Sequence, residues 1–470
     1  MKDAALVEAF NALTAWELRA FKTWLESPCF NRKTSLLRLY DYLEGCRNKR
    51  VEPYLAHAVA VVFDPPLPGL AKLRHEMSAL LKLLRDFLIW QELAQTPVQQ
   101  SLLLLKALRK RGLEKNFSLT LQETENLIAE GTLHVAFSEN LDHFRLEMEK
   151  YEWAIRSQRG PNFSFEDMAT SLSAWYAGQL LQIACVERSQ QAVHRREKQS
   201  ETWIEPVLQQ LPGRPQEQLP GVALYYQGYR MLSEHDGNEP VQVFRTLLEA
   251  HQSRLPRTEA RSLLMLAINH GIRRINEGDR TALHTTLDFY LLGLEKRLLQ
   301  DENGILSKYT YNNVLMNFLA LEEWEKAAQF LEVYRTQLPD KEEENTYCYN
   351  LAIYHFRRGD FDTTLELLRN VNFPDSMYNL EARKMLLKIY FEQGASDALE
   401  SSLENLLTWL RRHREIGYHR EMYRNLARFT GRLLRLSPGD EAQRRRLEKK
   451  IRDTPLVAER AWLLEKLKKK

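Results

Sequence analysis

Hydrophobic residues recur every three or four positions along most of this chain, which is the spacing of helices that bury one face. No sustained stretch alternates apolar and polar residues, the pattern typical of a half-buried β-strand. Glycine and proline, which interrupt helices, number only 19 and 17 among 470 residues, below their usual combined share of about 12%. The sequence therefore predicts an all-α protein with long helices and few loops.

Start and stop signals divide the first 160 residues into separate helices. Thr14 and Glu17 have the spacing of a capping box, and Thr96 followed by Pro97 predicts an N-cap with proline at the first helical position. Gly112 is the expected C-cap of the helix that begins at Pro97. Other helices are expected at about residues 34–43, 70–93, 117–130 and 133–158.

Gly160-Pro161 is the strongest break in the first half of the chain. We therefore expect an N-terminal helical domain at 1–160. A second capping pattern, Ser164 to Asp167, predicts a long helix that continues to about residue 195, and a Pro/Gly-rich linker follows at 211–221.

One helix-turn-helix pattern recurs three times in residues 309–410. Its clearest copy, at 346–372, has apolar residues at helical spacing on both sides of Gly359-Asp360. Gly can end a helix in the left-handed conformation, and Asp can cap the next one. Similar units occupy 311–335 and 383–408: Trp324 and Phe361 match at 37 residues, and Gly359 and Gly394 match at 35.

This period and these residues give the stretch a resemblance to tetratricopeptide repeats. The central copy keeps Leu351 and Ala352 in the first helix, the turn Gly359 and the aromatic Phe361. Cys348, His355 and Thr364 stand where the family has an aromatic residue, a Tyr and an Ala, and Glu322 replaces the turn glycine of the first copy. The layout is also similar to that of uncharacterised bacterial helical-repeat proteins. The resemblance implies an α-α superhelix, or solenoid.

The resemblance also implies a binding surface. In that family the first helix of each hairpin, helix A, lines the inner face, and peptide-binding members carry an amide there that holds ligand backbone. Asn313 and Asn350 match that position, and Tyr349, Lys384 and Lys388 take other inward positions. We expect a peptide-binding site at these five residues, although ordinary polar surface residues would give the same pattern.

Two further helical pairs precede the three copies. Residues 222–232 pair with 241–251, and 257–276 with 281–299, the latter joined by Gly278-Asp279. We interpret them as degenerate repeats, so the predicted hairpin array covers 161–410. The remaining residues, 411–470, are predicted to form basic helices that cap it.

Charge is unevenly distributed although the net formal charge is only +3. Residues 411–470 hold 19 Lys and Arg against 8 Asp and Glu, a balance of +11 that leaves −8 for the rest. Part of this positive charge comes from an arginine stripe on one helix face, formed by Arg420, Arg424, Arg428, Arg432 and Arg435. The stripe is either a solvated helix face, a docking surface for the acidic remainder of the chain, or a site for an acidic partner or nucleic acid.

Candidate chemistry is sparse. We find no phosphate-binding glycine loop, nucleophile elbow, zinc-binding His pair or calcium loop. The 12 His and 4 Cys are scattered, so we expect no metal site, no cofactor and no enzyme activity. Without a secretory signal or an apolar run of about 18 residues, a cytoplasmic protein with no membrane contact is expected.

These observations lead to one main hypothesis and two lesser ones. The main hypothesis is a non-catalytic scaffold or adaptor that binds a protein or peptide on the concave face of the helical array. The alternative is a nucleic-acid-binding regulator that uses the basic C-terminal helices. An enzyme with an unrecognised site in the N-terminal domain comes third.

Overall fold

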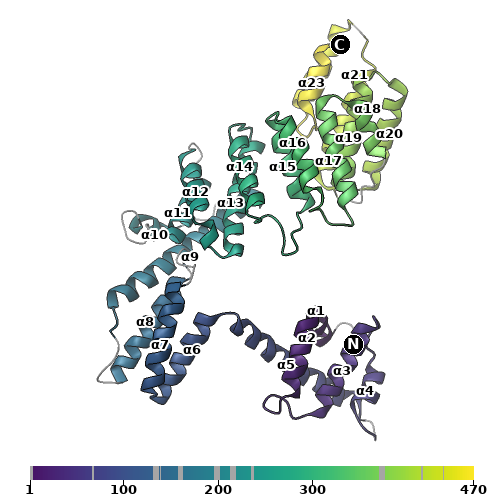
Figure 1. Ribbon diagram of the computed structural model, residues 1–470. Helices are drawn as coiled ribbons and strands as arrows, with labels where there is room; N and C mark the ends of the chain where they lie inside the picture. The colour runs from purple at the N-terminus through teal and green to yellow at the C-terminus, as the bar shows by residue number, and fades with distance from the viewer. Residues whose placement is uncertain are drawn as a thin grey trace. The chain divides into compact units, whose positions relative to one another are not determined.

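The computed structural model consists of helices joined by short connections (Figure 1). It describes residues 4–65, 68–130, 137, 139–156, 162–194, 202–211, 219–233, 238–369, 376–413, 416–437 and 439–469, without the side chains of 130 and 191–194. In these ranges there is no β-strand, only an isolated antiparallel bridge between Gln300 and Leu306. The all-α prediction is confirmed.

Contacts divide the chain into two compact units. Unit 1 comprises Met1–Gln179 with Gly213–Val222, and unit 2 comprises Leu180–Pro212 with Ala223–Lys470. Gly160 and Pro161, the predicted domain break, lie outside the described residues, as does most of the predicted 211–221 linker.

Unit 1 holds the first helices of the chain. They are α1 (Ala5–Ala12), α2 (Ala15–Glu26), α3 (Thr34–Asn48), α4 (Leu55–Val62), α5 (Leu70–Ala94), α6 (Pro97–Arg111), α7 (Glu114–Glu130), α8 (Glu139–Arg156) and the first half of α9 (Phe165–His194). The helices α1–α5 share one core around Phe10, Phe21 and Tyr40. A second core joins α6, α7 and α8, where Phe117 stacks on Trp153 with ring centroids 4.2 Å apart.

Local capping signals explain where several of these helices begin and end. The Thr14 hydroxyl accepts from the Glu17 amide at 3.2 Å and the Glu17 carboxylate accepts from the Thr14 amide at 2.6 Å, so the capping box is present. Ser164 caps α9 through the Asp167 amide at 3.0 Å. Gly112 ends α6 with φ of 68°.

Thr96 and Pro97 take the predicted N-cap and first helical positions of α6. The Thr96 hydroxyl, however, donates to the Leu93 carbonyl at 3.0 Å and makes no capping bond. The end of α5 is so close that one of its last carbonyls accepts a hydrogen bond from the hydroxyl.

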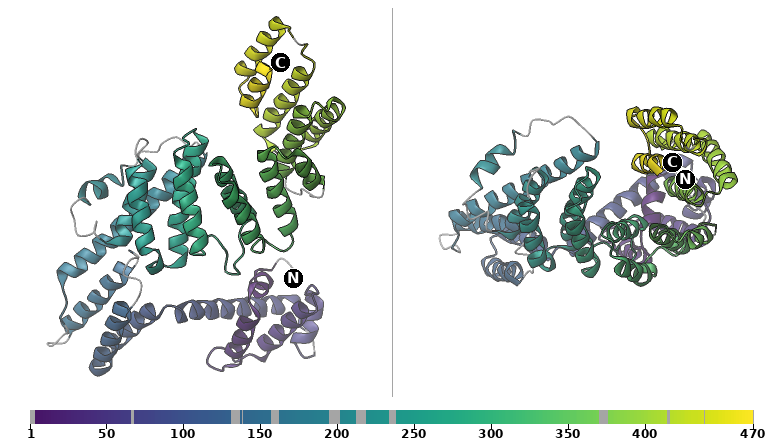
Figure 2. Two further views of the ribbon diagram at one scale, coloured as in Figure 1. Left: turned by 45° about the horizontal axis from the view of Figure 1, so that its top comes forward. Right: turned by 90° about the horizontal axis from the view of Figure 1, so that it is seen from above.

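Unit 2 contains the remaining helices (Figure 2). They are α10 (Glu205–Gln210), α11 (Pro220–Ser233, its start in unit 1), α12 (Glu239–His251), the 3-10 turn η2 (Gln252–Arg254), α13 (Arg257–Asn276), α14 (Ala282–Glu295), α15 (Lys308–Ala320), α16 (Trp324–Arg335), α17 (Glu343–Arg358), α18 (Phe361–Arg369), α19 (Ser376–Glu392), α20 (Ser396–Arg412), α21 (Tyr418–Leu434), α22 (Glu441–Asp453) and α23 (Arg460–Lys469). The predicted helix at 281–299 is too long, because Arg297 takes a left-handed φ of 54° just beyond α14.

The three predicted hairpins correspond to α15 with α16, α17 with α18, and α19 with α20, and each pair is in contact. Their turns share one backbone feature. Glu322, Gly359 and Gly394 all take a left-handed φ, of 59°, 80° and 65°. Glu322 thus adopts the conformation that glycine supplies in the other two turns, which places the three turns in the register deduced from the sequence.

Candidate functional site

The asparagines predicted to hold a peptide take part in packing between helices. Asn350 on α17 is fully buried; its amide nitrogen donates to the Thr346 carbonyl at 2.8 Å, and its oxygen accepts from Asn312 of α15 at 3.0 Å. Asn313 is partly exposed and hydrogen bonds with the Tyr290 phenol of α14. The structure therefore ties both amides to neighbouring helices.

Three tyrosines from the three A helices come together beside these amides, and we call them the tyrosine face: Tyr309 of α15, Tyr349 of α17 and Tyr378 of α19. The ring centroids of Tyr349 and Tyr378 lie 4.7 Å apart, and those of Tyr309 and Tyr378 lie 6.2 Å apart. Tyr349 is buried, whereas Tyr309 is 58% exposed. The ammonium of Lys308 lies 5.5 Å from the Tyr309 ring and 5.8 Å from the Tyr378 ring.

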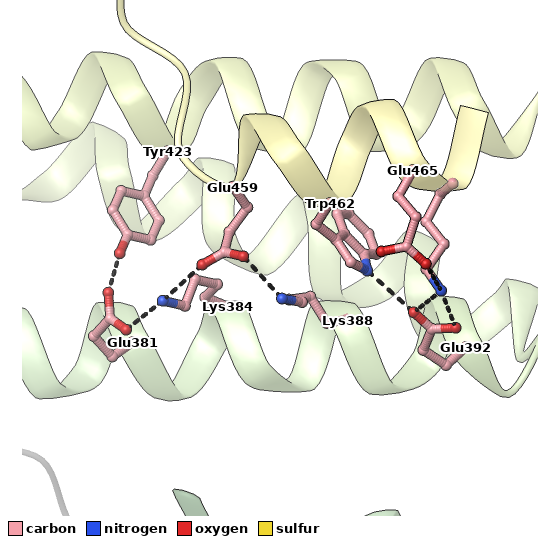
Figure 3. Close-up of polar contacts among 9 residues, drawn as sticks. Glu381, Lys384, Lys388, Glu392, Tyr423, Glu459, Trp462 and Glu465 are labelled. Carbon is pink, nitrogen blue, oxygen red and sulfur yellow. Dashed lines mark hydrogen bonds and ion pairs between the residues drawn. The ribbon is translucent and has the colours of Figure 1, made fainter. Parts of the chain in front are cut away.

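Lys384 and Lys388, the remaining predicted site residues, lie under the C-terminal segment of the chain (Figure 3). The Glu459 carboxylate bridges them, with one oxygen 3.2 Å from the Lys384 ammonium and the other 2.8 Å from that of Lys388. Lys384 also pairs with Glu381 at 2.5 Å, and Glu381 accepts a hydrogen bond from the Tyr423 hydroxyl of α21.

The same segment also contacts the C-terminal end of α19. Glu392, the last residue of α19, accepts from the Trp462 indole at 3.1 Å and from the Lys466 ammonium at 2.7 Å. Trp462 also packs edge-on against Phe391, with centroids 5.2 Å apart. We call Glu459, Trp462 and Lys466 the C-terminal clasp.

Apolar burial supports the clasp. On α23, Leu463 and Leu467 are almost fully buried in a core shared with Leu380 and Leu387 of α19. The segment is therefore held by charge pairs at its edge and by leucines beneath.

The clasp is an electrostatically matched site. Burial disfavours the Lys384 ammonium, but the carboxylates of Glu381 and Glu459 more than offset this and raise its pKa. Burial also disfavours the Glu459 carboxylate, and the neighbouring lysines Lys384 and Lys388 reverse this, so that its pKa is lowered. Glu459 has a left-handed φ of 53°, which is uncommon for a residue other than glycine.

The predicted arginine stripe is not uniform in the structure. Arg420 donates to the Leu410 carbonyl at 2.9 Å, and Arg424 pairs with Glu421 one turn away. Arg428 is exposed. The last two stripe residues, Arg432 and Arg435, line a hollow between α21 and α22.

That hollow has a volume of about 380 Å³ and is lined by four cationic side chains, Arg432, Arg435, Arg446 and Lys450, together with Gln443, Leu436 and Leu447. We call it the basic hollow. Leu436 and Leu447 are each 5% exposed and form its apolar floor. No carboxylate of the described residues lines it.

Two groups of residues were missed by the sequence reasoning. Arg446 and Lys450 lie four positions apart on α22, so helical spacing alone indicates that they share a face. The clasp residues Glu459, Trp462 and Lys466 have similar spacing, but their partners on α19 are about 70 residues away, and no local pattern reveals that pairing.

The described ranges contain no group of three His, Cys, Asp or Glu side chains arranged to hold a metal ion. None of the helices in those ranges is long and apolar enough to cross a membrane. No protein-family model, curated protein sequence or solved structure matches this chain.

Proposed function

We propose that the protein is a non-catalytic adaptor, a tetratricopeptide-like array of helical hairpins that binds a segment of a partner protein along its A helices. One observation carries the proposal: α19, an A helix, already binds a chain segment in cis. The segment from Glu459 to Lys469 runs beside α19 and is held by the charge pairs and leucines of the clasp. An amphipathic partner helix uses the same kinds of contact on a helical surface.

The tyrosine face is the part of this surface that we assign to the partner. The clasp covers Lys384 and Lys388, and Asn350 is buried, so those predicted ligand contacts are engaged within the chain. Tyr309 is exposed and has beside it the Lys308 ammonium, which also lies 3.3 Å from the Glu342 carboxylate. An aromatic ring next to a cation suits a partner segment with an apolar side chain followed by a carboxylate.

Site-specific photo-crosslinking in the cells of origin tests the proposal. A benzophenone amino acid replaces Tyr309, and in a control protein it replaces Val333, which is 55% exposed on α16, the second helix of the same hairpin. We expect a discrete adduct from position 309 and none from position 333. We further expect Lys308→Glu to weaken the adduct at 309, because the segment loses its counter-charge.

Identical adduct patterns at the two positions would show that the tyrosine face has no special role. An adduct at 309 that is indifferent to Lys308→Glu would remove the acidic character assigned to the partner.

A further inference from the structure

We propose that the basic hollow binds a diphosphate group. The inference concerns a different surface from the tyrosine face and does not depend on the proposed adaptor function. It rests on which cations of the C-terminal region are neutralised and which are not.

Most arginines around the basic hollow have an acidic partner one turn away. On α22, Arg444 and Arg445 both pair with Glu441, at 2.6 Å and 3.5 Å, and Arg452 pairs with Glu448 at 2.7 Å. The four cations of the hollow have no such pair among the described residues. Around one hollow the structure thus places four cations that have no ion pair in the described part of the chain.

Helix dipoles account for only part of this arrangement. A cation in the last turn of a helix is favourable because the carbonyl end carries partial negative charge, and this explains Arg432 at the end of α21 and Lys450 near the end of α22. Arg446 lies in the middle of α22, where that effect is absent, whereas Arg435 is the C-cap residue of α21 and still lies at its carbonyl end. The helix dipoles therefore favour three of the four positions, but Arg446 is placed among like charges without that compensation.

The charge of the hollow indicates the size of the anion. Its four cations supply a formal charge of +4. One phosphate group carries about −1.5 to −2 near neutral pH, so two are needed to balance the hollow. Arginine binds phosphate oxygens in a bidentate fashion, and the three guanidinium groups offer several such pairs of donors. Gln443 adds an uncharged donor at the rim.

A compact anion fits better than a nucleic-acid backbone. A polymer requires a basic track that follows successive phosphates. Here the track is interrupted, because Arg420 and Arg424 are engaged by the Leu410 carbonyl and by Glu421. Leu436 and Leu447 form an apolar floor, and the four cations around it are exposed or half-buried, so a small anion can reach all of them from solvent.

The test is a titration of the full-length protein with inorganic pyrophosphate, ADP, orthophosphate and duplex DNA, followed by calorimetry at fixed ionic strength. Two double variants on α22 remove the same formal charge: Arg446→Gln/Lys450→Gln inside the hollow, and Arg444→Gln/Arg445→Gln outside it. All four positions are on the same helix and none is fully buried, so circular dichroism should show both variants folded.

We expect pyrophosphate to bind the wild type and the outer variant alike, and the hollow variant at least about tenfold more weakly, because two charge-assisted contacts are lost. Orthophosphate should bind more weakly than pyrophosphate. If ADP binds as tightly as pyrophosphate, the site recognises the diphosphate alone. If ADP binds more tightly than pyrophosphate, the site also recognises the nucleoside.

Three results would overturn the proposal. The first is no pyrophosphate binding to the wild type. The second is an equal loss of affinity in both variants, which would mean diffuse attraction by net charge. The third is binding of duplex DNA that depends on Arg446 and Lys450 without binding of pyrophosphate, which would make the hollow part of a nucleic-acid surface.

Discussion

Replacing Glu459 by Gln tests whether the clasp holds the C-terminal segment on α19. The substitution keeps the shape of the side chain and removes the charge that bridges two lysines. The amide can accept a hydrogen bond from one ammonium only weakly, so Lys384 and Lys388 are left close together without their shared counter-ion.

The size of the effect follows from the exposure of the three groups. The side chains of Lys384, Lys388 and Glu459 remain 17%, 16% and 27% exposed. Removing one partner of a buried ion pair costs about 3–5 kcal/mol, and an exposed pair contributes about 0.2–1 kcal/mol. A cluster at this intermediate burial should lose about 2 kcal/mol, which is about a 30-fold change in the equilibrium for opening.

Hydrogen exchange measured by mass spectrometry is the suitable assay, because it reports opening of one segment without global unfolding. Amides of α23 should exchange about 30-fold faster in Glu459→Gln than in the wild type, while those of α13 and α14 stay unchanged. Glu465→Gln is the matched control. It removes one negative charge from the same segment, but Glu465 is 54% exposed and pairs with Lys469 at 2.5 Å. Its carboxylate is 3.8 Å from Lys466 and forms no ion pair with Lys384 or Lys388.

The reasoning is refuted if Glu459→Gln and Glu465→Gln exchange at the same rate. In that case the leucines beneath α23 hold the segment and the charge pairs contribute nothing measurable.

Three further predictions follow from the geometry. Because the pKa of Glu459 is lowered in the folded chain, its contribution is complete above the pKa of an unfolded glutamate, about 4.3, and is lost as the pH falls through the lower folded value. The protection of the α23 amides, measured against the intrinsic exchange rate at each pH, should therefore fall below about pH 4 in the wild type, but not in Glu459→Gln. Glu322→Gly should raise the free energy of unfolding by about 0.5–1 kcal/mol in urea, and Gly359→Ala should lower it by about 1–2 kcal/mol, because both turns are left-handed; opposite signs would remove the argument about these turns. Asn350→Ala should lower the thermal midpoint through a loss of about 1–2 kcal/mol, since its amide joins α15 to α17, and an unchanged midpoint would instead favour the ligand role predicted from the sequence.

The helices and their turns were predictable because their signals are local. Gly359 and Gly394 mark turns through a conformation that other residues avoid, and Thr14 and Glu17 satisfy each other's backbone amides within one turn. The turn at Glu322 was also predicted at the correct position, from the spacing of the residues around it. Thr96 takes the N-cap position that Pro97 indicates, although its hydroxyl donates to the Leu93 carbonyl of the preceding helix and makes no capping bond.

The partners of the candidate site residues were not predictable in the same way. Spacing placed Lys384 and Lys388 on one face of α19, but nothing near them in sequence identifies Glu459 as their counter-ion. The basic hollow is an intermediate case. Pairs such as Glu441 with Arg444 show which arginines are neutralised within their own helix, whereas the meeting of Arg435 with Arg446 depends on how α21 and α22 cross.

The clasp has a consequence for how the chain is made. Lys388 and Glu459 are 71 residues apart, and the pairs to Glu392 span 70 and 74 residues. At a synthesis rate of about 5–20 residues per second, α19 emerges roughly 4–14 s before the segment that covers it. Throughout that interval Lys384, Lys388 and Glu392 lack their partners from that segment, so a chaperone or an early partner has seconds in which to occupy the place of α23.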